Sequence, residues 1–276
     1  MAQRSILITG CSSGIGYDAA HGLAKRGWRV FATARKPEDV ARLADEGLEA
    51  LRLDVTIPEQ MDEVLDLIRD RTGGTLDAVF LNAAHGLPGA VEDLPTDGLR
   101  ACFETNFFAV HELVRKVIPI MRAQGHGHIV INGSVLGFVV YPWRAAYNTT
   151  KFALEGYADT LRIEMADTPI RVVLVEPGPI TSNIRRNSVQ HFERWIDWEA
   201  SPRAEQYRSA LLKRLYEERG PDPFELPPSA VTQKLARALD QRDPPPRIFV
   251  TTPTYAMNLA RRLLPTRALD WLIRRG

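Results

Sequence analysis

The chain has 276 residues, of which 45% are hydrophobic and 25% charged, so its length and composition suit one globular domain with a large core. A formal net charge of +1 gives no reason to expect nucleic acid as a partner, and two cysteines, Cys11 and Cys102, are too few for a disulfide framework or a metal site. The first residues lack the layout of a signal peptide, and no apolar run reaches the ~18 residues that a membrane span needs. We therefore expect a cytoplasmic protein without a metal.

Strand-like and helix-like segments alternate along the chain, with short connections and no internal repeat. Apolar, β-branched runs predict strands at 5–10, 28–34, 49–55, 76–83, 127–134, 170–177 and 247–252. Helical patterns fall at 17–27, 37–46, 58–72, 96–122, 145–167 and 228–241. Because most of the strands are apolar on both faces, this alternation predicts a single-domain α/β fold: a Rossmann-like, doubly wound parallel sheet with helices on both faces.

The first predicted strand runs directly into a glycine loop. Gly10, Gly14 and Gly16 stand between that strand and the first helical pattern. This order is typical of a dinucleotide-binding site, in which Gly10 permits a tight turn while Gly14 and Gly16 let the backbone and the helix N-terminus approach a pyrophosphate. The spacing differs from G-x-G-x-x-G, so the loop alone leaves open an ordinary turn between a strand and a helix.

The end of the second strand bears on the choice between two dinucleotides. An acidic residue there accepts a hydrogen bond from the ribose 2′-OH of NAD, whereas an arginine accommodates the 2′-phosphate of NADP. This chain has Arg35 and Lys36 at that place, no carboxylate before Glu38, and in Ser13 a hydroxyl that could reach the same phosphate. We predict NADP; the alternative is that Arg35 and Lys36 are a solvated loop pair.

Six of the candidate residues stand at or near the ends of predicted strands. They are Thr9, Ala34, Asp54, Asn82, Ser134 and Glu176. In parallel sheets, ligands bind beyond the carboxyl ends of the strands. We therefore expect these residues to converge on one edge of the sheet.

Tyr147 and Lys151 stand four residues apart in a helical pattern, and Ser134 ends the strand before it. This spacing places the phenol and the ammonium on one helical face, toward which Ser134 can point. A free phenol titrates near pH ~10. A positive charge about 4 Å away at an effective dielectric of roughly 20 would lower its pKa by at most ~3 units, to near 7. The three residues predict a proton-transfer site, although the bare spacing is also common on ordinary amphipathic helices.

Several short motifs stand in a fixed order along the chain. They are the segment TGCSSGIG at 9–16, Asp54-Val55, Asn82-Ala83, Asn106, Ser134, Tyr147-x-x-x-Lys151 and Pro177-Gly178. Over roughly residues 5–182 this order and spacing resembles the short-chain dehydrogenase/reductase family. It is most similar to the branch that includes 17β-hydroxysteroid and retinol dehydrogenases and their bacterial relatives.

The resemblance implies four catalytic residues. Tyr147 would protonate the carbonyl oxygen as a hydride arrives, and Ser134 would hydrogen-bond that oxygen and stabilise its developing charge. Lys151 would lower the pKa of Tyr147 and hold the nicotinamide ribose. Asn106 would bend its helix around an ordered water that links Lys151 to solvent.

The resemblance also implies a set of cofactor-binding residues. They are Gly10, Ser12, Ser13, Gly14, Ile15, Gly16, Arg35, Asp54, Val55, Asn82, Ala83, Tyr147, Lys151, Pro177, Gly178, Ile180 and Ser182. The chain departs from the family at 81–84, where Leu-Asn-Ala-Ala replaces Asn-Asn-Ala-Gly and Ala84 adds a methyl group near the expected adenine ribose. Either Thr181 or Ser182 would supply a hydroxyl to the nicotinamide carboxamide. His85 is predicted to be a solvated loop histidine, with a position facing the substrate as the alternative.

Residues 183–226 look like an insertion rich in aromatic side chains: Phe192, Trp195, Trp198, Tyr207 and Tyr216. Such a segment could form a mobile apolar lid over a bulky apolar carbonyl compound. Burial of the aromatics against the domain or a second subunit is an almost equal alternative.

The last segment, 253–276, interleaves leucines and a tryptophan with five arginines, while Pro265 breaks its helical pattern. We treat residues 1–252 as the catalytic domain and 253–276 as an amphipathic tail. The tail is predicted to pack on the substrate pocket or across the interface of a homodimer or homotetramer. Contact with an anionic membrane surface is the less favoured alternative.

Taken together, these features predict an NADP-dependent oxidoreductase that acts on a steroid, a retinoid or an aliphatic aldehyde or ketone. A 3-keto acyl reductase is an alternative substrate assignment. An NADP-sensing protein without turnover would have no use for Ser134, Tyr147 and Lys151 together. An epimerase or dehydratase would carry a different glycine opening and a larger carboxyl-terminal domain.

Overall fold

The predicted fold is confirmed, because seven parallel strands form one sheet. The computed structural model describes residues 3–217 and 220–275, and the strands within them follow the order β3-β2-β1-β4-β5-β6-β7. They are β1 Ser5–Ile8, β2 Arg29–Ala34, β3 Glu49–Arg52, β4 Ala78–Leu81, β5 Gly127–Asn132, β6 Ile170–Glu176 and β7 Arg247–Phe249. The strand order changes direction between β1 and β4, which is where such sheets bind their ligands.

Helices join the strands and cover the sheet. Those before β6 are α1 Gly14–Ala24, α2 Pro37–Asp45, α3 Pro58–Thr72, α4 Thr96–Phe103, α5 Ala109–Gln124 and α6 Ala145–Glu164. Shorter turns are η1 Val91–Asp93, the π-helical η2 Glu104–Phe108 and η3 Val135–Gly137. After β6 come α7 Ile184–Trp195, α8 Ala204–Gln206, the π-helical η4 Tyr207–Leu211, α9 Leu212–Tyr216, α10 Ser229–Leu239, α11 Thr252–Leu263 and α12 Thr266–Arg275. The helix predicted at 96–122 is therefore interrupted by a π-helical turn.

Two hydrophobic cores lie on opposite faces of the sheet. Successive side chains of a strand point to opposite faces. Accordingly, Ile129 and Leu174 pack with α3, α5 and α6, whereas Val130 and Val173 pack with α1, α2 and α10. Because both faces of the sheet are covered by helices, the strand sequences are continuous apolar runs.

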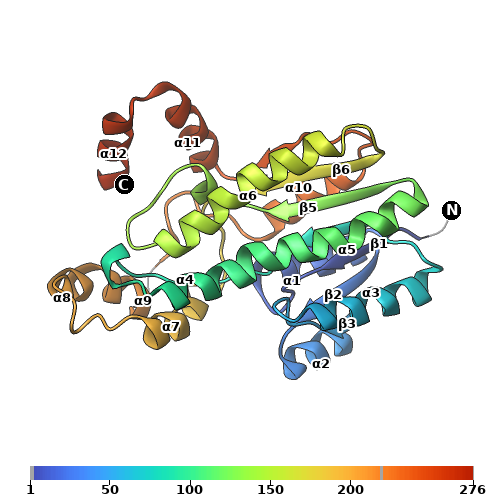
Figure 1. Cartoon of the computed structure of the whole chain (residues 1–276), viewed down its shortest axis with the longest axis horizontal. Coiled ribbons are helices and arrows are strands. Elements are labelled where there is room, and N and C mark those ends of the chain that lie inside the picture. Colours follow the sequence, from blue (N-terminus) through green and yellow to red (C-terminus); the bar gives the residue numbers. More distant parts are fainter. Residues whose placement is uncertain (1–2, 218–219, 276) are drawn as a thin grey trace.

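The strands direct their carboxyl ends to one end of the molecule. In Figure 1 the arrow of β5 points toward the end where α7, α8 and α9 gather. The parallel register runs the same way through the whole sheet, from β3 to β7. The predicted site residues at the strand ends therefore share one edge of the sheet.

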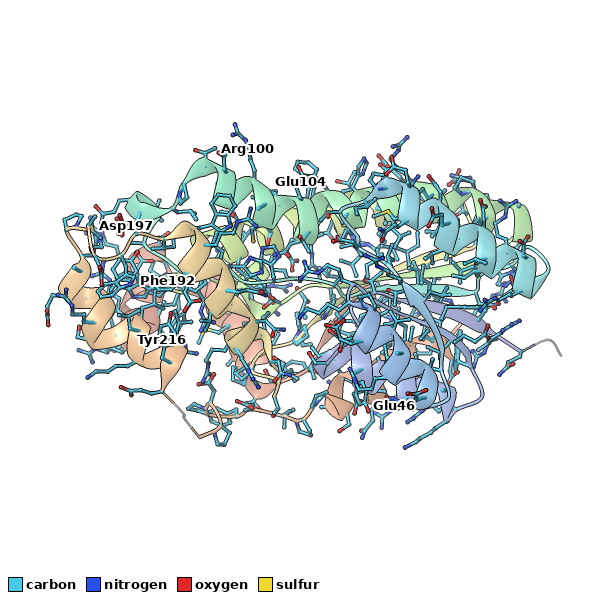
Figure 2. All side chains as sticks on the ribbon, turned by 90° about the horizontal axis from the view of Figure 1, so that it is seen from below. Glu46, Arg100, Glu104, Phe192, Asp197 and Tyr216 are labelled. Carbon is cyan, nitrogen blue, oxygen red and sulfur yellow. The ribbon has the colours of Figure 1, made fainter. Side chains whose placement is uncertain are left out.

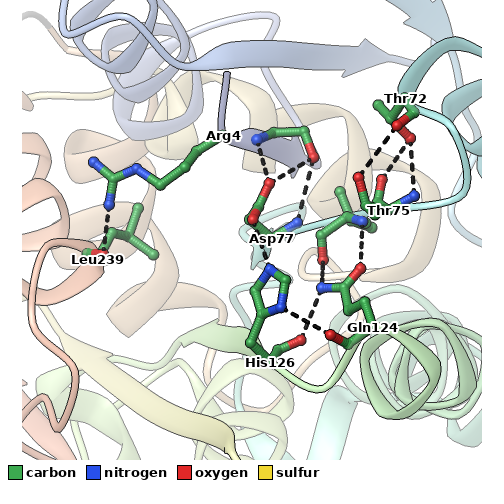
Figure 3. A network of polar contacts seen from close by, with 9 residues as sticks. Arg4, Thr72, Thr75, Asp77, Gln124, His126 and Leu239 are labelled. Atoms are coloured by element: carbon green, nitrogen blue, oxygen red, sulfur yellow. Dashed lines mark hydrogen bonds and ion pairs between the residues drawn. The ribbon is translucent and has the colours of Figure 1, made fainter. Parts of the chain in front are cut away.

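At the opposite, amino end of the sheet, a polar network joins neighbouring strands (Figure 3). Asp77 accepts hydrogen bonds from the backbone N of Ser5 at 2.7 Å and from its hydroxyl at 3.1 Å, and its other oxygen lies 2.9 Å from Nε2 of His126. The amide of Gln124 pairs with both the N and the O of Leu76, each at 2.9 Å. These side chains replace the ladder partners that the strand ends lack.

The segment predicted as a lid buries part of its aromatic content in a third core (Figure 2). Phe192 is 1% exposed and Tyr207 is 0% exposed. The hydroxyl of Tyr207 donates to Asp93 at 2.8 Å and accepts from the N of Ala90 at 2.8 Å. For Phe192 and Tyr207 the structure therefore supports burial against the domain. Positions 218–219 of this segment, like 1–2 and 276, lie outside the described residues.

The carboxyl-terminal tail forms two helices, α11 and α12, with Pro265 between them where the sequence predicted a break. The guanidinium of Arg261 lies 5.4 Å from the ring centroid of Phe152 on α6, so α11 is anchored to the domain. Large apolar side chains nevertheless stay exposed on the tail: Tyr255, Leu259, Leu263, Leu264 and Trp271. Among the described helices, none is long and apolar enough to cross a bilayer.

Candidate active site

The three residues predicted for proton transfer meet at the carboxyl end of β5. Tyr147 and Lys151 lie on α6, and Ser134 follows β5, where its Oγ accepts a hydrogen bond from the N of Leu136 at 3.1 Å. Nζ of Lys151 donates to the backbone O of Asn132 at 2.6 Å and lies 5.5 Å from the ring centroid of Tyr147. Lys151 is buried, whereas Tyr147 keeps some accessible surface.

The electrostatics differ from the sequence prediction. Burial raises the pKa of Tyr147 to about 12, while its hydrogen bond with Ser134 and the charge of Arg144 act in the opposite direction. Burial also lowers the pKa of Lys151 to about 8. The expectation that Lys151 brings the tyrosine pKa near 7 is therefore wrong for the protein as described, because loss of solvent outweighs the neighbouring charges. A phenol that keeps its proton at neutral pH is prepared to act as an acid.

Asn106 lies in the π-helical turn η2 and is 1% exposed. Its Oδ1 accepts from the N of His85 at 3.0 Å, and its Nδ2 donates to the O of His85 at 2.9 Å and to Oγ1 of Thr150 at 3.2 Å. π-Helical turns are rare and often mark functional sites. Here the widened turn lets one amide clamp the loop after β4 to the helix that carries Tyr147 and Lys151.

His85 is not the solvated histidine that the sequence predicted. Its ring stacks on that of His191 of α7, with centroids 3.9 Å apart and planes 17° apart. Burial, followed by the charges of His191 and Arg35, lowers the pKa of His85 to about 3. The imidazole is therefore neutral and fixed against the segment over the site.

The glycine loop has the crowding that the motif predicts. Gly10 has φ +73°, and a Cβ there would lie 2.9 Å from Cα of Ala83. A Cβ on Gly16 would lie 2.3 Å from the O of Gly10, so only glycine lets α1 come this close to β1. No side chain caps the N-terminus of α1 at Ser13, and its first amides remain available to an anion.

The side chain of Asn82 forms hydrogen bonds with neighbouring strand ends of the protein itself. Its Nδ2 donates to the O of Thr9 at 2.9 Å and its Oδ1 accepts from Asn132 at 2.9 Å, while Oγ1 of Thr9 accepts from the N of Asn82 and of Ala83. Since this side chain is fully used, Asn82 shapes the edge of the site. Thr9 and Asn132 serve the same purpose, and a polar residue in an otherwise apolar strand was the signal for both.

At the end of β2, Arg35 and Lys36 are both exposed, and Lys36 lies 4.0 Å from Glu38. The sequence reasoning missed a third cation nearby: Arg42 of α2 donates to the O of Ser12 at 2.7 Å and pairs with Asp39 at 3.1 Å. Arg42 thereby ties α2 to the glycine loop.

Other predicted cofactor residues lie along the same edge. The carboxylate of Asp54 accepts from both the N and the hydroxyl of Thr56, so it fixes its own turn. Val55 and Ala83 line a small cavity behind the edge, and Ile15 packs with the core under α1.

The segment after β6 carries the two candidate hydroxyls, those of Thr181 and Ser182. The O of Pro177 accepts from the N of Val135 at 2.8 Å, and Gly178 has no room for a Cβ because Oγ1 of Thr251 would be 2.1 Å away. Ile180 bridges to Leu226. Oγ1 of Thr181 is engaged with Glu225 at 2.7 Å, whereas Cβ of Ser182 would lie 3.2 Å from a Cβ on Gly14. Ser182 is therefore the hydroxyl beside the glycine loop.

The comparison with known proteins places the chain in a family. The sequence profile described as short chain dehydrogenase matches residues 4–193, which is more than half of the chain. The chain belongs to the short-chain dehydrogenase/reductase family and is an oxidoreductase of that family.

Two curated relatives and one solved structure show the range of similar proteins. An uncharacterized oxidoreductase, YbbO, from Escherichia coli K12 is 34% identical over 98% of this chain and 94% of its own length. Human retinol dehydrogenase 8 is 38% identical over 66% of this chain and 60% of its own length. A short chain dehydrogenase/reductase from Burkholderia phymatum, in complex with NAD, has the same fold with a TM-score of 0.79, at 24% identity over 100% of this chain and 96% of its own.

Proposed function

We propose that the protein transfers a hydride between NADP(H) and the carbonyl or alcohol group of a bulky, largely apolar substrate, such as a steroid, a retinoid or an aliphatic aldehyde or ketone. The observation that supports this most is the convergence of Ser134, Tyr147 and Lys151 at the carboxyl edge of the sheet, beside the uncapped N-terminus of α1. A binding protein would gain nothing from that combination.

The residues present fit a nicotinamide dinucleotide. The amides at the start of α1 would hold the pyrophosphate, Arg35 would meet the 2′-phosphate, and Ser182 would meet the carboxamide. When bound, NADPH supplies the hydride. The Lys151 ammonium, held by the O of Asn132 at 2.6 Å, is placed to hold a ribose hydroxyl while staying buried.

In the direction of reduction, the phenol of Tyr147 donates its proton to the carbonyl oxygen. The hydroxyl of Ser134 donates a hydrogen bond to the same oxygen as negative charge develops there. Asn106 keeps α6 and the loop at His85 in register, so that Tyr147 and Lys151 stay at the edge of the sheet.

The test of the reaction class is Tyr147→Phe, assayed by NADPH oxidation against steroid, retinoid, aliphatic aldehyde and 3-keto acyl panels. Loss of general acid catalysis lowers the rate by ~10² to 10⁴, and NADPH affinity should change little because one hydroxyl is removed. Tyr157→Phe is the matched control, because Tyr157 lies on the same helix and, within residues 3–217 and 220–275, its hydroxyl bonds only to His111, at 3.2 Å. A Tyr147→Phe rate above about a tenth of wild type would contradict the role of Tyr147. Tight NADPH binding by the wild type without turnover of any panel would favour the NADP-sensing alternative.

The test of the cofactor is Arg35→Ala. A charge-assisted contact with the 2′-phosphate predicts about 10- to 100-fold weaker NADPH binding and an almost unchanged affinity for NADH. Lys36→Ala is the control, because Lys36 is equally exposed and is paired with Glu38. A wild-type protein that prefers NADH, or a variant that loses both cofactors equally, would make NAD the cofactor or Arg35 a structural residue.

We further propose a homodimer or homotetramer whose interface covers the exposed apolar side chains of α11 and α12. Light scattering measures the molar mass of the full chain and of a chain that ends at Thr252. Circular dichroism checks that the shorter chain is folded. Co-sedimentation of the full chain with anionic liposomes, lost on truncation, would favour the membrane alternative.

A further inference from the structure

Arg144 stands at the entrance to the catalytic helix. It is the residue directly before α6, with φ −132° and ψ 27°, and it stands three residues before Tyr147. The segment that carries it is fixed, because the N of Gly89 donates to the O of Trp143 at 2.9 Å and Trp143 adopts φ +66°. A non-glycine residue with positive φ is strained, so the surroundings hold this turn in place.

The guanidinium of Arg144 has no acidic partner among residues 3–217 and 220–275. No ion pair joins it to a described carboxylate, and its nearest aromatic contact is the ring of Tyr141, 5.4 Å from its Cζ. Burial, and next the charge of Arg214, lowers the pKa of Arg144, while Asp222 and Tyr147 act in the opposite direction. Arg144 is therefore a cation close to another positive charge, that of Arg214, and its own charge acts on the phenol of Tyr147.

Positive charge also exceeds negative charge around Arg144. Arg185 of α7 and Arg214 of α9 lie 3.0 Å and 3.3 Å from the same oxygen of Asp222, so one carboxylate serves two guanidinium groups. That carboxylate forms ion pairs with Arg185 and Arg214, and it acts on Arg144 through its charge without forming an ion pair with it. These three arginines come from the helix of Tyr147 and from the segment over the site.

Arg144 is half-buried and has no ion pair with a described carboxylate, so its guanidinium remains available to an anion that enters from solvent. Arginine is the side chain best suited to carboxylate and phosphate groups, because its planar fork matches their geometry. We propose that Arg144 binds an anionic group, carboxylate or phosphate, at the far end of the carbonyl substrate. The inference rests on the proposed function and narrows its substrate class to apolar carbonyl compounds that carry one negative charge.

The competing explanation is that Arg144 acts only on the phenol, since its charge lowers the pKa of Tyr147. That role would affect every substrate alike and would shift the pH profile of kcat. A role in recognition depends on the charge of the substrate and acts mainly through KM. The two explanations therefore predict different results for matched charged and neutral compounds.

The turnover experiment uses straight-chain oxo acids with one to six methylenes between carbonyl and carboxylate, each paired with its methyl ester, and oxoalkyl phosphates paired with their alcohols. Wild type should favour the charged member of at least one pair tenfold or more in kcat/KM. Arg144→Gln should lower kcat/KM for that charged member by about 10- to 100-fold, through KM, and by far less for its neutral partner. Arg144→Lys should recover part of the loss. Arg208→Gln is the control, because Arg208 is an exposed arginine of the same overlying segment and stacks 5.3 Å from Trp198.

A binding experiment separates this inference from the proposed function, because it requires no turnover. Hexanoate, hexyl phosphate and uncharged hexanamide are titrated into full-length protein by calorimetry, with and without NADP⁺. Tighter binding of one anion than of hexanamide, lost in Arg144→Gln and kept in Arg208→Gln, supports the inference and names the anion. Equal binding of anion and amide, or an equal loss of both charged and neutral turnover with a shifted pH profile, would overturn it.

Discussion

The two ends of the sheet use polar side chains in opposite ways. At the amino end, Asp77, Gln124 and His126 pair with one another or with the backbone of neighbouring strands (Figure 3). At the carboxyl end, the buried Oδ1 atoms of Asn132 and Asn148 have no hydrogen-bond partner among the described residues, and the carboxyl groups of Glu155 and Glu176 face each other. Buried polar atoms are nearly always hydrogen-bonded, so these two oxygen atoms are exceptions. Polar side chains are therefore paired more completely at the amino end, where Nε of Arg171 is the one such atom among the described residues.

The cluster beneath α6 shows this contrast most clearly. Arg247 of β7 lies 2.9 Å from Glu176, which is 0% exposed, and 2.7 Å from Asp159, and it also contacts Glu155. Burial and the neighbouring Glu155 raise the pKa of Glu176 to about 9. Glu155 stands one helical turn after Lys151, so these carboxyl groups lie directly behind the site.

The largest effect on stability is expected for Arg247→Leu. Removing Arg247 takes away the cation that contacts both Glu155, whose side chain is 14% exposed, and Glu176, and breaking a buried pair in this way destabilises a fold by about 3–5 kcal/mol. Urea unfolding measures the change, and Arg69→Leu is the control because Arg69 pairs with Asp66 on an exposed face. If the free energy of unfolding falls by less than 1 kcal/mol at pH 7, the carboxyl groups take up protons at little cost in free energy.

A smaller effect is expected at the amino end for Asp77→Ala. The N of Ser5 would lose its partner inside the sheet, a loss of about 1–3 kcal/mol. The kcat of the folded variant should equal that of wild type, because the residue lies at the opposite end of the strands from Tyr147. A fall in kcat beyond twofold would contradict the separation of the two ends.

A further prediction concerns how stability depends on pH through Glu176. An acid whose pKa rises on folding, here from 4.5 to about 9, contributes its full stability below pH 4.5 and loses it as pH rises toward 9. Glu176→Gln removes this loss, so the Tm of the variant relative to wild type should increase from pH 5 to pH 9. A difference of 1 kcal/mol corresponds to ~2–4 °C in a chain of this size. A Tm difference that stays constant with pH would show that Glu176 does not hold a proton.

Local patterns in the sequence were sufficient for the strands, the crowded glycine loop and the convergence of Ser134, Tyr147 and Lys151 at one edge of the sheet, because each depends on residues close together in the chain or on strand ends that a parallel sheet must bring together. The same patterns could not reveal the pairing of Arg247 with Glu155, which lies 92 residues away, or the stacking of His85 on His191. These contacts depend on how the helices pack against the assembled sheet. The pKa of Tyr147 was wrongly predicted for a related reason. The prediction considered the charge of Lys151 and left out the effect of removing the phenol from solvent.

The position of β1 at the middle of the sheet has a consequence for the order of folding during synthesis. Ile6 pairs with Val30 on one side and with Ala78 on the other, so β1 is synthesised before β4 and waits for it before its ladder is complete. All described strand pairs are parallel, and none is a local hairpin. Because non-local parallel pairing is slow, the nascent chain exposes apolar strand surface for longer than a helical protein does. The central position of β1, directly before the glycine loop, therefore also prolongs the exposure of apolar strands while the chain grows.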